Sequence, residues 1–190
     1  MTADIALPKD WDRSGLPGWA YFSQELFELE CDTLFKTHWQ FVCHVNEAAE
    51  IGAYVTFDLA GERALVIRGH DGILRAFHNL CRHRGSRIVP DARGVCNKAM
   101  VCPYHGWVYH IDGSLKVARE THVMRDFDQA QHGLKPVNCV TYMGLVFINC
   151  DPNAGDLSAS LDQIKAQLGA YDLDHAKVAH RKTYRVDANW

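Results

Sequence analysis

Cys81-Arg82-His83 and, after eighteen intervening residues, Cys102-Pro103-Tyr104-His105 are the two stretches that decide how this 190-residue chain folds. Each stretch, called a ligand box below, supplies one thiolate and one imidazole. A Cys and a His two or three residues apart on a tight loop can face two adjacent metal ions of one small cluster. Gly85 and Gly106 follow the two His residues, and glycine lets backbone N–H groups approach bound sulfide closely. The sequence therefore predicts a metal cluster held between two loops.

Two Cys and two His form the ligand set of a Rieske-type [2Fe–2S] centre, in which two imidazoles replace two thiolates on one iron. We expect the thiolates of Cys81 and Cys102 to hold one iron, and the imidazoles of His83 and His105 to hold the other. Because imidazole is neutral, such a cluster has a higher reduction potential than a four-Cys cluster. The alternative is a Cys2His2 zinc site, although zinc sites usually pair like ligands in a C-x2-C step.

The composition indicates an ordinary globular protein, 47% hydrophobic with a net charge of −3. Its length suffices for one domain with a core, or for one domain and part of another. No run of about 18 apolar residues predicts a membrane span. Residues 1–17 lack the apolar region of a signal peptide, and no basic stripe suggests nucleic acid as a partner. We expect a cytoplasmic protein.

The number of cysteines also favours a cytoplasmic protein. Seven cysteines, an odd number, in a chain without a visible secretion signal are typical of reduced thiols. Four of the five cysteines outside the ligand boxes lie in apolar-patterned segments, and we interpret them as small buried hydrophobic residues: Cys31, Cys43, Cys139 and Cys150. Cys96 lies between the two boxes, but the ligand set is complete without it.

The chain divides into three parts. Residues 1–38 read as an arm and a helix over 24–37, which begins at the N-cap Ser23 with Glu25 in its first turn. Residues 39–152 alternate with a period of two, which predicts a mainly β domain, an antiparallel β-sandwich with both ligand boxes on loops at one end. The expected strands are 39–44, 54–58, 63–68, 73–79, 99–101, 107–111, 115–117, 137–142 and 145–149.

Residues 153–190 form the third part. Asp156, Ser158 or Ser160 could cap a helix that contains Leu161, Ile164 and Leu168 on one face. Residues 181–186 then read as a strand, and the chain stops at residues 187–190 without a cap or a turn. We interpret this ending as the start of a further domain that the chain does not contain.

The segments CRHRGSRI (81–88), CPYHGWVYHIDGSL (102–115) and YRVDANW (184–190) resemble the N-terminal part of the large (α) subunit of Rieske non-haem iron oxygenases. The similarity runs from about residue 19 to the last residue. In this family a Rieske domain precedes a catalytic domain, and an Asn-Trp pair stands near the start of the latter. The resemblance therefore implies that residues 153–190 are a connector and the start of a truncated catalytic domain.

The resemblance also implies a function. A reductase or a ferredoxin would reduce the cluster, and the electron would pass to a mononuclear Fe(II) for O2-dependent hydroxylation or demethylation. That iron is expected only in the missing catalytic domain, and family members are commonly homotrimers. The stretch FHNLCRHRGSRI (77–88) is reminiscent of members that act on quaternary amines such as glycine betaine, choline or carnitine. The alternative is a stand-alone Rieske ferredoxin-like carrier, which would not need the helix over 24–37 or the segment 181–190.

Three positions distinguish the chain from high-potential respiratory Rieske proteins. Those proteins carry an extra, disulfide-forming Cys beside each box, where this chain has Ser86 and Tyr104. They also carry a Ser where this chain has Trp107, so one hydrogen bond to the cluster is lost. We predict a potential near the lower end of the range of about −150 to +300 mV.

Two further patterns in the sequence resemble functional sites. Asp172, His175 and His180 follow the order of a two-His, one-carboxylate iron triad. The family's His pair lies after the Asn-Trp, however, and five-residue spacing does not place two His on one helical face, so we interpret this segment as a solvated connector. Three arginines crowd the first box, either as surface salt bridges or as a docking site for an acidic electron donor: Arg82, Arg84 and Arg87.

Overall fold

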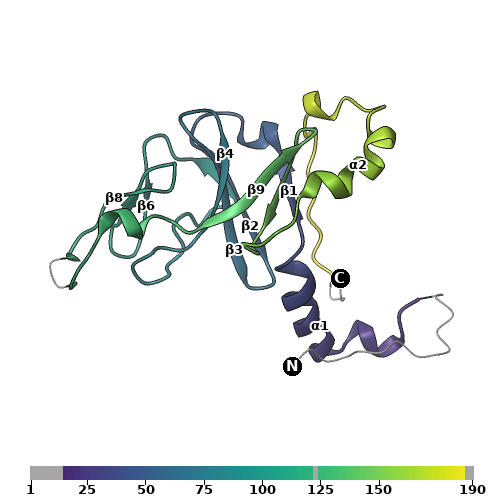
Figure 1. Ribbon diagram of the computed structural model, residues 1–190, viewed down its shortest axis with the longest axis horizontal. Helices are drawn as coiled ribbons and strands as arrows, with labels where there is room; N and C mark the ends of the chain where they lie inside the picture. Colours follow the sequence, from purple (N-terminus) through teal and green to yellow (C-terminus); the bar gives the residue numbers. More distant parts are fainter. Residues whose placement is uncertain (1–14, 122–123, 187–190) are drawn as a thin grey trace.

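The computed structural model describes residues 15–121 and 124–186 (Figure 1). Its main element is a seven-stranded antiparallel sheet in the order β1-β10-β9-β4-β3-β2-β5, and a three-stranded sheet has the order β6-β7-β8. The expected mainly β, antiparallel fold is confirmed. The strands are β1 (Gln40–His44), β2 (Ala53–Leu59), β3 (Glu62–Arg68), β4 (Leu74–His78), β5 (Arg93–Val95), β6 (Met100–Val101), β7 (Val108–Tyr109), β8 (Leu115–Val117), β9 (Pro136–Tyr142) and β10 (Leu145–Asn149).

Nine of these ten strands lie where the sequence predicts them, and β5 is the one that it missed. β5 is three residues long with Gly94 at its centre, and it pairs with the start of β2, where Ala53 faces Val95. A strand this short, with glycine inside it, gives no alternation that sequence patterns could detect.

The central strands β2, β3 and β4 are buried on both faces. In β3, Leu65 and Ile67 face one side, whereas Ala64 and Val66 face the other. The first side packs against the loops and the small sheet in what we call the loop-side core: Tyr54, Leu65, Ile67, Phe77, Cys81, Ile88, Val89, Met100, Cys102, Trp107, Tyr109, Ile111, Leu115 and Leu134. The large sheet curls around the second, the sheet core: Val42, Cys43, Ala48, Ala53, Val55, Ala64, Val66, Ala76, Val137, Val146 and Ile148.

The N-terminal helix begins as the sequence predicts. Ser23 Oγ accepts a hydrogen bond from Leu26 N at 3.2 Å and caps α1 (Gln24–Glu30). The helix continues as a π-helical turn over Cys31–Phe35, where Lys36 N donates to Cys31 O. Asp156 caps α2 (Leu157–Leu168) through Ser158 N. Short 3-10 turns occupy Gly18–Tyr21, Val45–Ala48, Gln129–His132 and Leu173–His175.

The predicted strand over residues 181–186 is wrong, because this segment pairs with no strand in the described part of the chain. Alternating side chains favour extended backbone, but a strand also needs a neighbour for its N–H and C=O groups. The Asn-Trp pair at 189–190 lies outside the described residues.

The segment before it is fastened to the start of the large sheet by residues 44–47, a set of contacts that we call the connector clasp. His44 Nε2 lies 2.7 Å from Leu173 O, and Asn46 Nδ2 donates to Ala176 O at 2.9 Å. Glu47 Oε1 binds Arg181 at 2.7 Å and Arg93 at 2.6 Å, and this carboxylate side chain is only 6% exposed.

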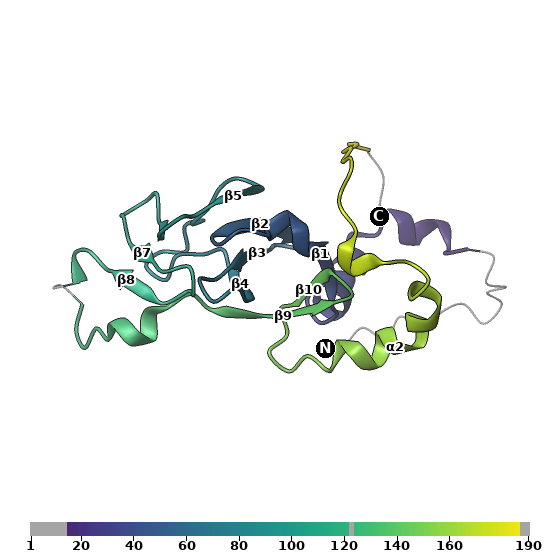
Figure 2. The same ribbon diagram turned by 90° about the horizontal axis from the view of Figure 1, so that it is seen from above.

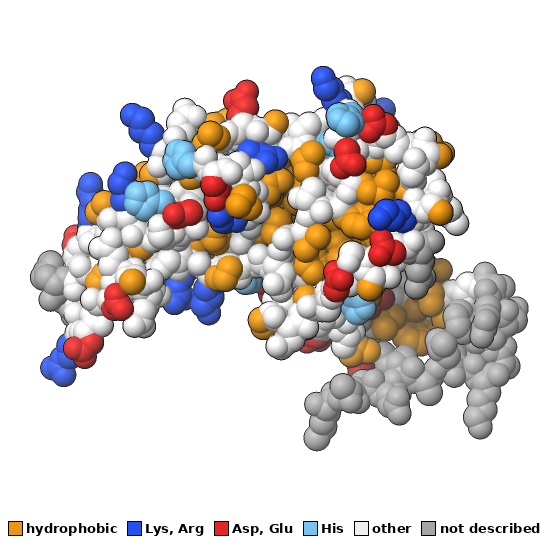
Figure 3. Space-filling view, turned by 45° about the horizontal axis from the view of Figure 1, so that its top comes forward, with side chains coloured by type: hydrophobic (Ala, Val, Ile, Leu, Met, Phe, Trp, Pro, Cys, Tyr) orange, Lys and Arg blue, Asp and Glu red, His pale blue; other side chains and the backbone are white. Residues whose placement is uncertain are grey.

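Figures 1 and 2 place the three-stranded sheet at one end of the molecule and both α-helices at the opposite end. In the space-filling view of Figure 3, apolar side chains gather across the middle of the visible face, and charged side chains lie mostly around them. Among the described residues, none of the helices has the length and apolar character that crossing a lipid bilayer requires.

Candidate metal-cluster site

The two ligand boxes form loops with the same hydrogen-bond pattern. In the first loop, Cys81 N donates to Ser86 O at 2.8 Å and Gly85 N donates to Cys81 O at 2.9 Å. In the second, Cys102 N donates to Trp107 O at 2.8 Å and Gly106 N donates to Cys102 O at 3.0 Å. Gly85 and Gly106 have φ values of +65° and +68°, a conformation that glycine adopts without strain. The loops are therefore structural equivalents that begin at the end of β4 and of β6.

Asn79, two residues before the first box, holds the two ends of the first loop together. Its side chain is fully buried, and its Oδ1 accepts hydrogen bonds from Ile88 N and Val89 N, both at 3.1 Å. Its Nδ2 donates to Val89 O at 2.8 Å. One asparagine thus joins the chain before the loop to the chain after it.

The structure brings the four predicted ligand residues together. Cys81 and Cys102 are 3% and 2% exposed, and both lie in the loop-side core, where the neighbouring Cys102 contributes to raising the pKa of Cys81. The rings of His83 and His105 meet edge to face, with centroids 4.6 Å apart. The thiols form one pair and the imidazoles another, as a cluster with one iron per pair would require.

The chemistry of these side chains fits a [2Fe–2S] group. The Nδ1 atoms of His83 and His105 are buried and have no hydrogen-bond partner among the described residues. Buried ring nitrogens are normally satisfied, so two such atoms on facing rings are explained by coordination. Burial and the neighbouring His105 lower the pKa of His83, which favours the neutral imidazole that binds metal. Burial raises the pKa of the Cys81 thiol, a cost that a bound metal ion offsets because it deprotonates the thiol.

Tyr109 is a site residue that the sequence analysis missed. Its hydroxyl lies 3.2 Å from Cys81 Sγ and accepts a hydrogen bond from Arg82 N at 2.9 Å. Burial, followed by the contact with Cys81, raises the pKa of Tyr109 well above its ordinary value, so the hydroxyl keeps its proton. Tyr109 is therefore positioned to donate a hydrogen bond to the Cys81 sulfur.

Aromatic side chains cover both imidazoles. Trp107, fully buried, stacks on His83 with ring centroids 5.0 Å apart and planes 11° apart. Phe127 packs against Trp107, and the ring centroid of His132 lies 4.5 Å from that of Phe127. Tyr104 is 59% exposed, and its ring lies 3.8 Å from that of His105.

The three arginines of the first box have different surroundings. Arg87 forms an ion pair with Asp58 at 2.7 Å, which agrees with the salt-bridge interpretation. Arg84 is exposed. Arg82 is half-buried, and its Nε has no hydrogen-bond partner in the described ranges.

The remaining candidates lie away from this site. Cys43 is fully buried as predicted, and desolvation raises its pKa to about 12. Cys139 and Cys150 are half-buried against the sheet core, whereas Cys96 packs against the loop-side core. Cys31 is half-buried in the π-helical turn. His175 pairs with Asp172 at 2.8 Å on the exposed connector, and His180 is exposed.

Comparison with protein families and solved structures identifies the domain. Residues 38–128 match the Rieske [2Fe–2S] domain family. This part of the chain is a Rieske [2Fe–2S] domain. Its cofactor is therefore a [2Fe–2S] cluster, and the zinc interpretation is set aside.

Comparison with curated proteins shows which proteins that carry a Rieske domain this chain resembles. The carnitine monooxygenase oxygenase subunit of Escherichia coli (strain K12) is 34% identical over 197 residues, which cover 100% of this chain and 52% of the relative. The glycine betaine monooxygenase oxygenase subunit of Pseudomonas aeruginosa (strain UCBPP-PA14) is 38% identical over 189 residues, which cover 100% of this chain and 43% of the relative. The chain spans about half the length of the curated relatives it matches.

Solved structures agree. The apo form of the quaternary ammonium Rieske monooxygenase CntA superposes with a TM-score of 0.84 at 34% identity, over 93% of this chain and 52% of that chain. Naphthalene 1,2-dioxygenase from Rhodococcus sp. bound to indole gives 0.74 at 30% identity, over 80% of this chain and 35% of that chain. The Rieske chain is thus related to the N-terminal portion of Rieske oxygenase α subunits, in the quaternary-amine branch.

Proposed function

We propose that Cys81 and Cys102 hold one iron of a [2Fe–2S] cluster as thiolates, and that His83 and His105 hold the other through Nδ1. The observation that carries this assignment is the pair of buried Nδ1 atoms, without a partner among the described residues, on facing imidazoles, in a site that also holds two buried thiols. When bound, the cluster supplies one-electron transfer. The protein holds its ligands on two equivalent loops and screens them from water with Trp107 and Phe127.

The solvent exposure of the four candidate ligands indicates on which side of the cluster an electron enters or leaves. The thiols are buried in the loop-side core, whereas His83 and His105 are half-buried and closer to solvent. The imidazole edges are therefore the side from which an electron can leave or enter. We assign the donor as a reductase or a ferredoxin and the acceptor as a mononuclear iron in the part of the oxygenase that this chain does not span.

The wider assignment rests on the relatives. The similarity to carnitine and glycine betaine monooxygenase subunits favours a quaternary amine as substrate, oxidised by O2-dependent hydroxylation or demethylation. One solved relative is described in terms of inter-subunit electron transfer, which favours more than one subunit here, and we assign a homotrimer. We assign the whole protein to the cytoplasm, with 1–38 as arm and helix, 39–152 as the Rieske domain and 153–190 as connector and start of the catalytic domain.

The test is metal analysis combined with EPR of the reduced protein. We expect about two irons and two sulfides per chain and a Rieske-type spectrum. Cys102→Ser and His105→Ala should each lose the cluster, whereas Cys96→Ser, a matched variant at a cysteine between the boxes, should keep it. Retention of the full iron content in His105→Ala, or its loss in Cys96→Ser, would contradict the ligand assignment.

A further inference from the structure

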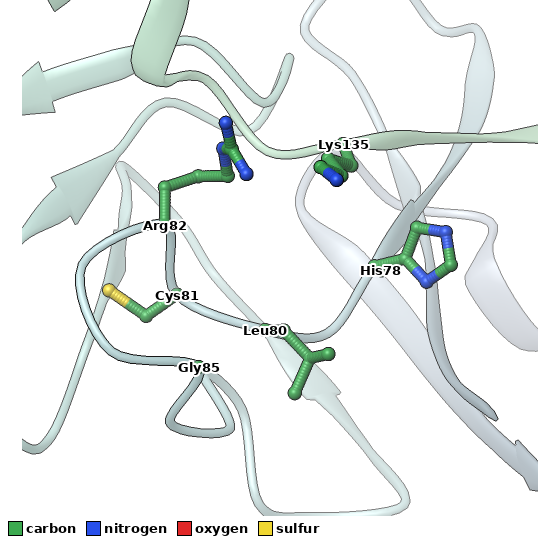
Figure 4. Close-up of a pocket in the computed structure, with 6 residues that line it drawn as sticks. All are labelled: His78, Leu80, Cys81, Arg82, Gly85 and Lys135. Atoms are coloured by element: carbon green, nitrogen blue, oxygen red, sulfur yellow. The ribbon is translucent and has the colours of Figure 1, made fainter. Parts of the chain in front are cut away.

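A cavity of about 390 Å³ lies beside the first ligand box, and Cys81 is one of the residues that line it (Figure 4). One wall is the loop itself, with Leu80, Cys81 and Gly85, and another comes from the segment that enters β9. Figure 4 shows the guanidinium of Arg82 reaching toward Lys135, whereas Cys81 Sγ points away from both. The lining residues are His78, Leu80, Cys81, Arg82, Gly85 and Lys135.

The charged residues that line this cavity are basic. Arg82 and Lys135 line it and none of the lining residues is acidic, although the lining His78 lies 3.6 Å from the carboxylate of Glu62. Neither cation has an ion-pair partner among the described residues, and the buried Nε of Arg82 has no hydrogen-bond acceptor there. Arg87, on the same loop, is neutralised by Asp58, which shows that this surface does pair arginines where a carboxylate is available. A cation without an ion-pair partner beside a cavity favours an anionic occupant, because a charge-assisted hydrogen bond is stronger than a neutral one.

We propose that the cavity between Arg82 and Lys135 is a carboxylate-binding pocket, and that its occupant is an acidic side chain of the protein that delivers electrons to the cluster. The fork of N–H groups on a guanidinium matches the two oxygens of a carboxylate, and an ammonium adds a second, less directional contact. This inference rests on the proposed function, because it presupposes a protein electron donor.

The position of the pocket favours a protein partner over a free anion. The chain carries a net charge of −3, so an acidic partner is repelled by the molecule as a whole and attracted where unpaired cations are exposed. Such local complementarity orients a partner during encounter. Because the pocket wall is the backbone of the first ligand box, a side chain bound there brings its protein into contact with the loop that holds Cys81.

Binding can be measured without the electron-transfer reaction. The probe is a fluorescein-labelled hexaglutamate peptide, titrated by fluorescence anisotropy against the cluster-loaded protein in low-salt buffer. We expect Lys135→Gln and Arg82→Gln each to weaken binding about tenfold, which is the loss of one charge-assisted contact. Lys116→Gln, which removes an exposed lysine outside the cavity on β8, should change binding less than twofold.

The second readout is the stopped-flow rate at which an acidic plant-type [2Fe–2S] ferredoxin, previously reduced, reduces the cluster. Lys135→Gln should slow this bimolecular rate about tenfold while leaving the iron content and EPR spectrum unchanged. Equal losses in Lys135→Gln and Lys116→Gln would overturn the pocket in favour of general surface charge. Displacement of the peptide by millimolar acetate would overturn the assigned occupant in favour of a small-anion site. A protein without a Rieske spectrum would overturn the proposed function, whereas peptide binding would still test the pocket.

Discussion

The hydroxyl group of Tyr109 links the segment after the second ligand box to the first box. It follows the second box on β7, yet it lies 3.2 Å from the sulfur of Cys81 in the first. A hydrogen bond to a thiolate sulfur stabilises the electron-rich reduced cluster and so raises its potential.

We therefore expect Tyr109→Phe to lower the reduction potential by tens of millivolts, since about 1.4 kcal/mol corresponds to about 59 mV for one electron. Protein-film voltammetry measures the shift. Tyr142→Phe, which removes a hydroxyl that donates to Asp162 at 2.9 Å on the opposite part of the fold, is the control and should leave the potential unchanged. An unchanged potential in Tyr109→Phe would show that this hydroxyl does not tune the cluster.

Trp107 stands where high-potential Rieske proteins carry a hydroxyl that hydrogen-bonds to the cluster. Trp107→Ser restores a hydroxyl at this position and should therefore raise the reduction potential. However, Trp107 is 0% exposed and stacks on His83, so its removal also opens a cavity that costs about 3–5 kcal/mol. A shift in this variant would combine both effects.

Gly113 occupies a position where even one added methyl group should destabilise the fold. It has a φ of +87°, and an added Cβ would collide with the ring of Phe77 in the loop-side core. We expect Gly113→Ala to lower the free energy of unfolding by about 2–4 kcal/mol, from the unfavourable backbone conformation and overpacking together. In Gly61→Ala the φ is similar, +83°, but no atom lies within 4 Å, so a loss of about 1–2 kcal/mol is expected. Urea unfolding of both variants separates the collision from the backbone term, and equal losses would exclude the collision.

Among the elements, the connector clasp depends on one carboxylate. Glu47 binds Arg93 and Arg181, and its Oε2 accepts a hydrogen bond from His44 N at 3.0 Å. Glu47→Ala should destabilise the protein by about 1–3 kcal/mol, the range for hydrogen bonds to charged groups. It should also release the connector, so that trypsin cleaves after Lys177 faster than in the unmodified protein.

Asp58→Ala provides the comparison, because it also removes the partner of an arginine but at a side chain that is 51% exposed. We expect a loss below about 1 kcal/mol and no change in cleavage after Lys177. If the two variants behaved alike in the protease assay, the clasp would not be what holds the connector.

The elements also show which parts of the fold the sequence could predict. Strands such as β3 and β9 carry long apolar or alternating runs, and Ser23 and Asp156 cap the helices in the way their chemistry predicts. The sequence could not predict which strands pair: the segment 181–186 alternates like a strand and pairs with no strand in the described ranges, whereas β5 barely alternates and is paired. Neighbours in space, which decide both cases, leave no local pattern.

The residues of the candidate site likewise divide into those that the sequence predicts and those that depend on neighbours in space. Its four candidate ligands are visible because two boxes of Cys and His repeat one spacing. Asn79 and Tyr109 are not visible, because each owes its role to residues about ten and thirty positions away: Val89 in the first case and Cys81 in the second. A polar residue at the end of a strand has the same appearance whether it supports a loop or faces water.

For the molecule as a whole, the two cores share the strands β2, β3 and β4. The loops cannot melt without exposing one face of these strands, so we expect a single unfolding transition. Far-UV circular dichroism and the visible absorption of the cluster should give the same midpoint in a thermal scan. Cluster binding should raise this midpoint, because a ligand that binds the folded state stabilises it. Loss of the visible bands well below the melting of the sheet would show that the loops unfold independently.

In the strands that are buried on both faces, hydrophobicity alone does not determine which face packs against which core. A strand with one polar face turns that face to solvent, but a strand that is apolar on both faces has no such preference. Here side-chain volume supplies it: Leu65, Ile67 and Phe77 all face the loops, whereas Ala64, Val66 and Ala76 face the sheet core. A slip of one position would force large side chains into the space of small ones and leave voids opposite. The difference in side-chain volume between the two faces thus fixes the register of these strands, and with it the position of the ligand loops that pack on them.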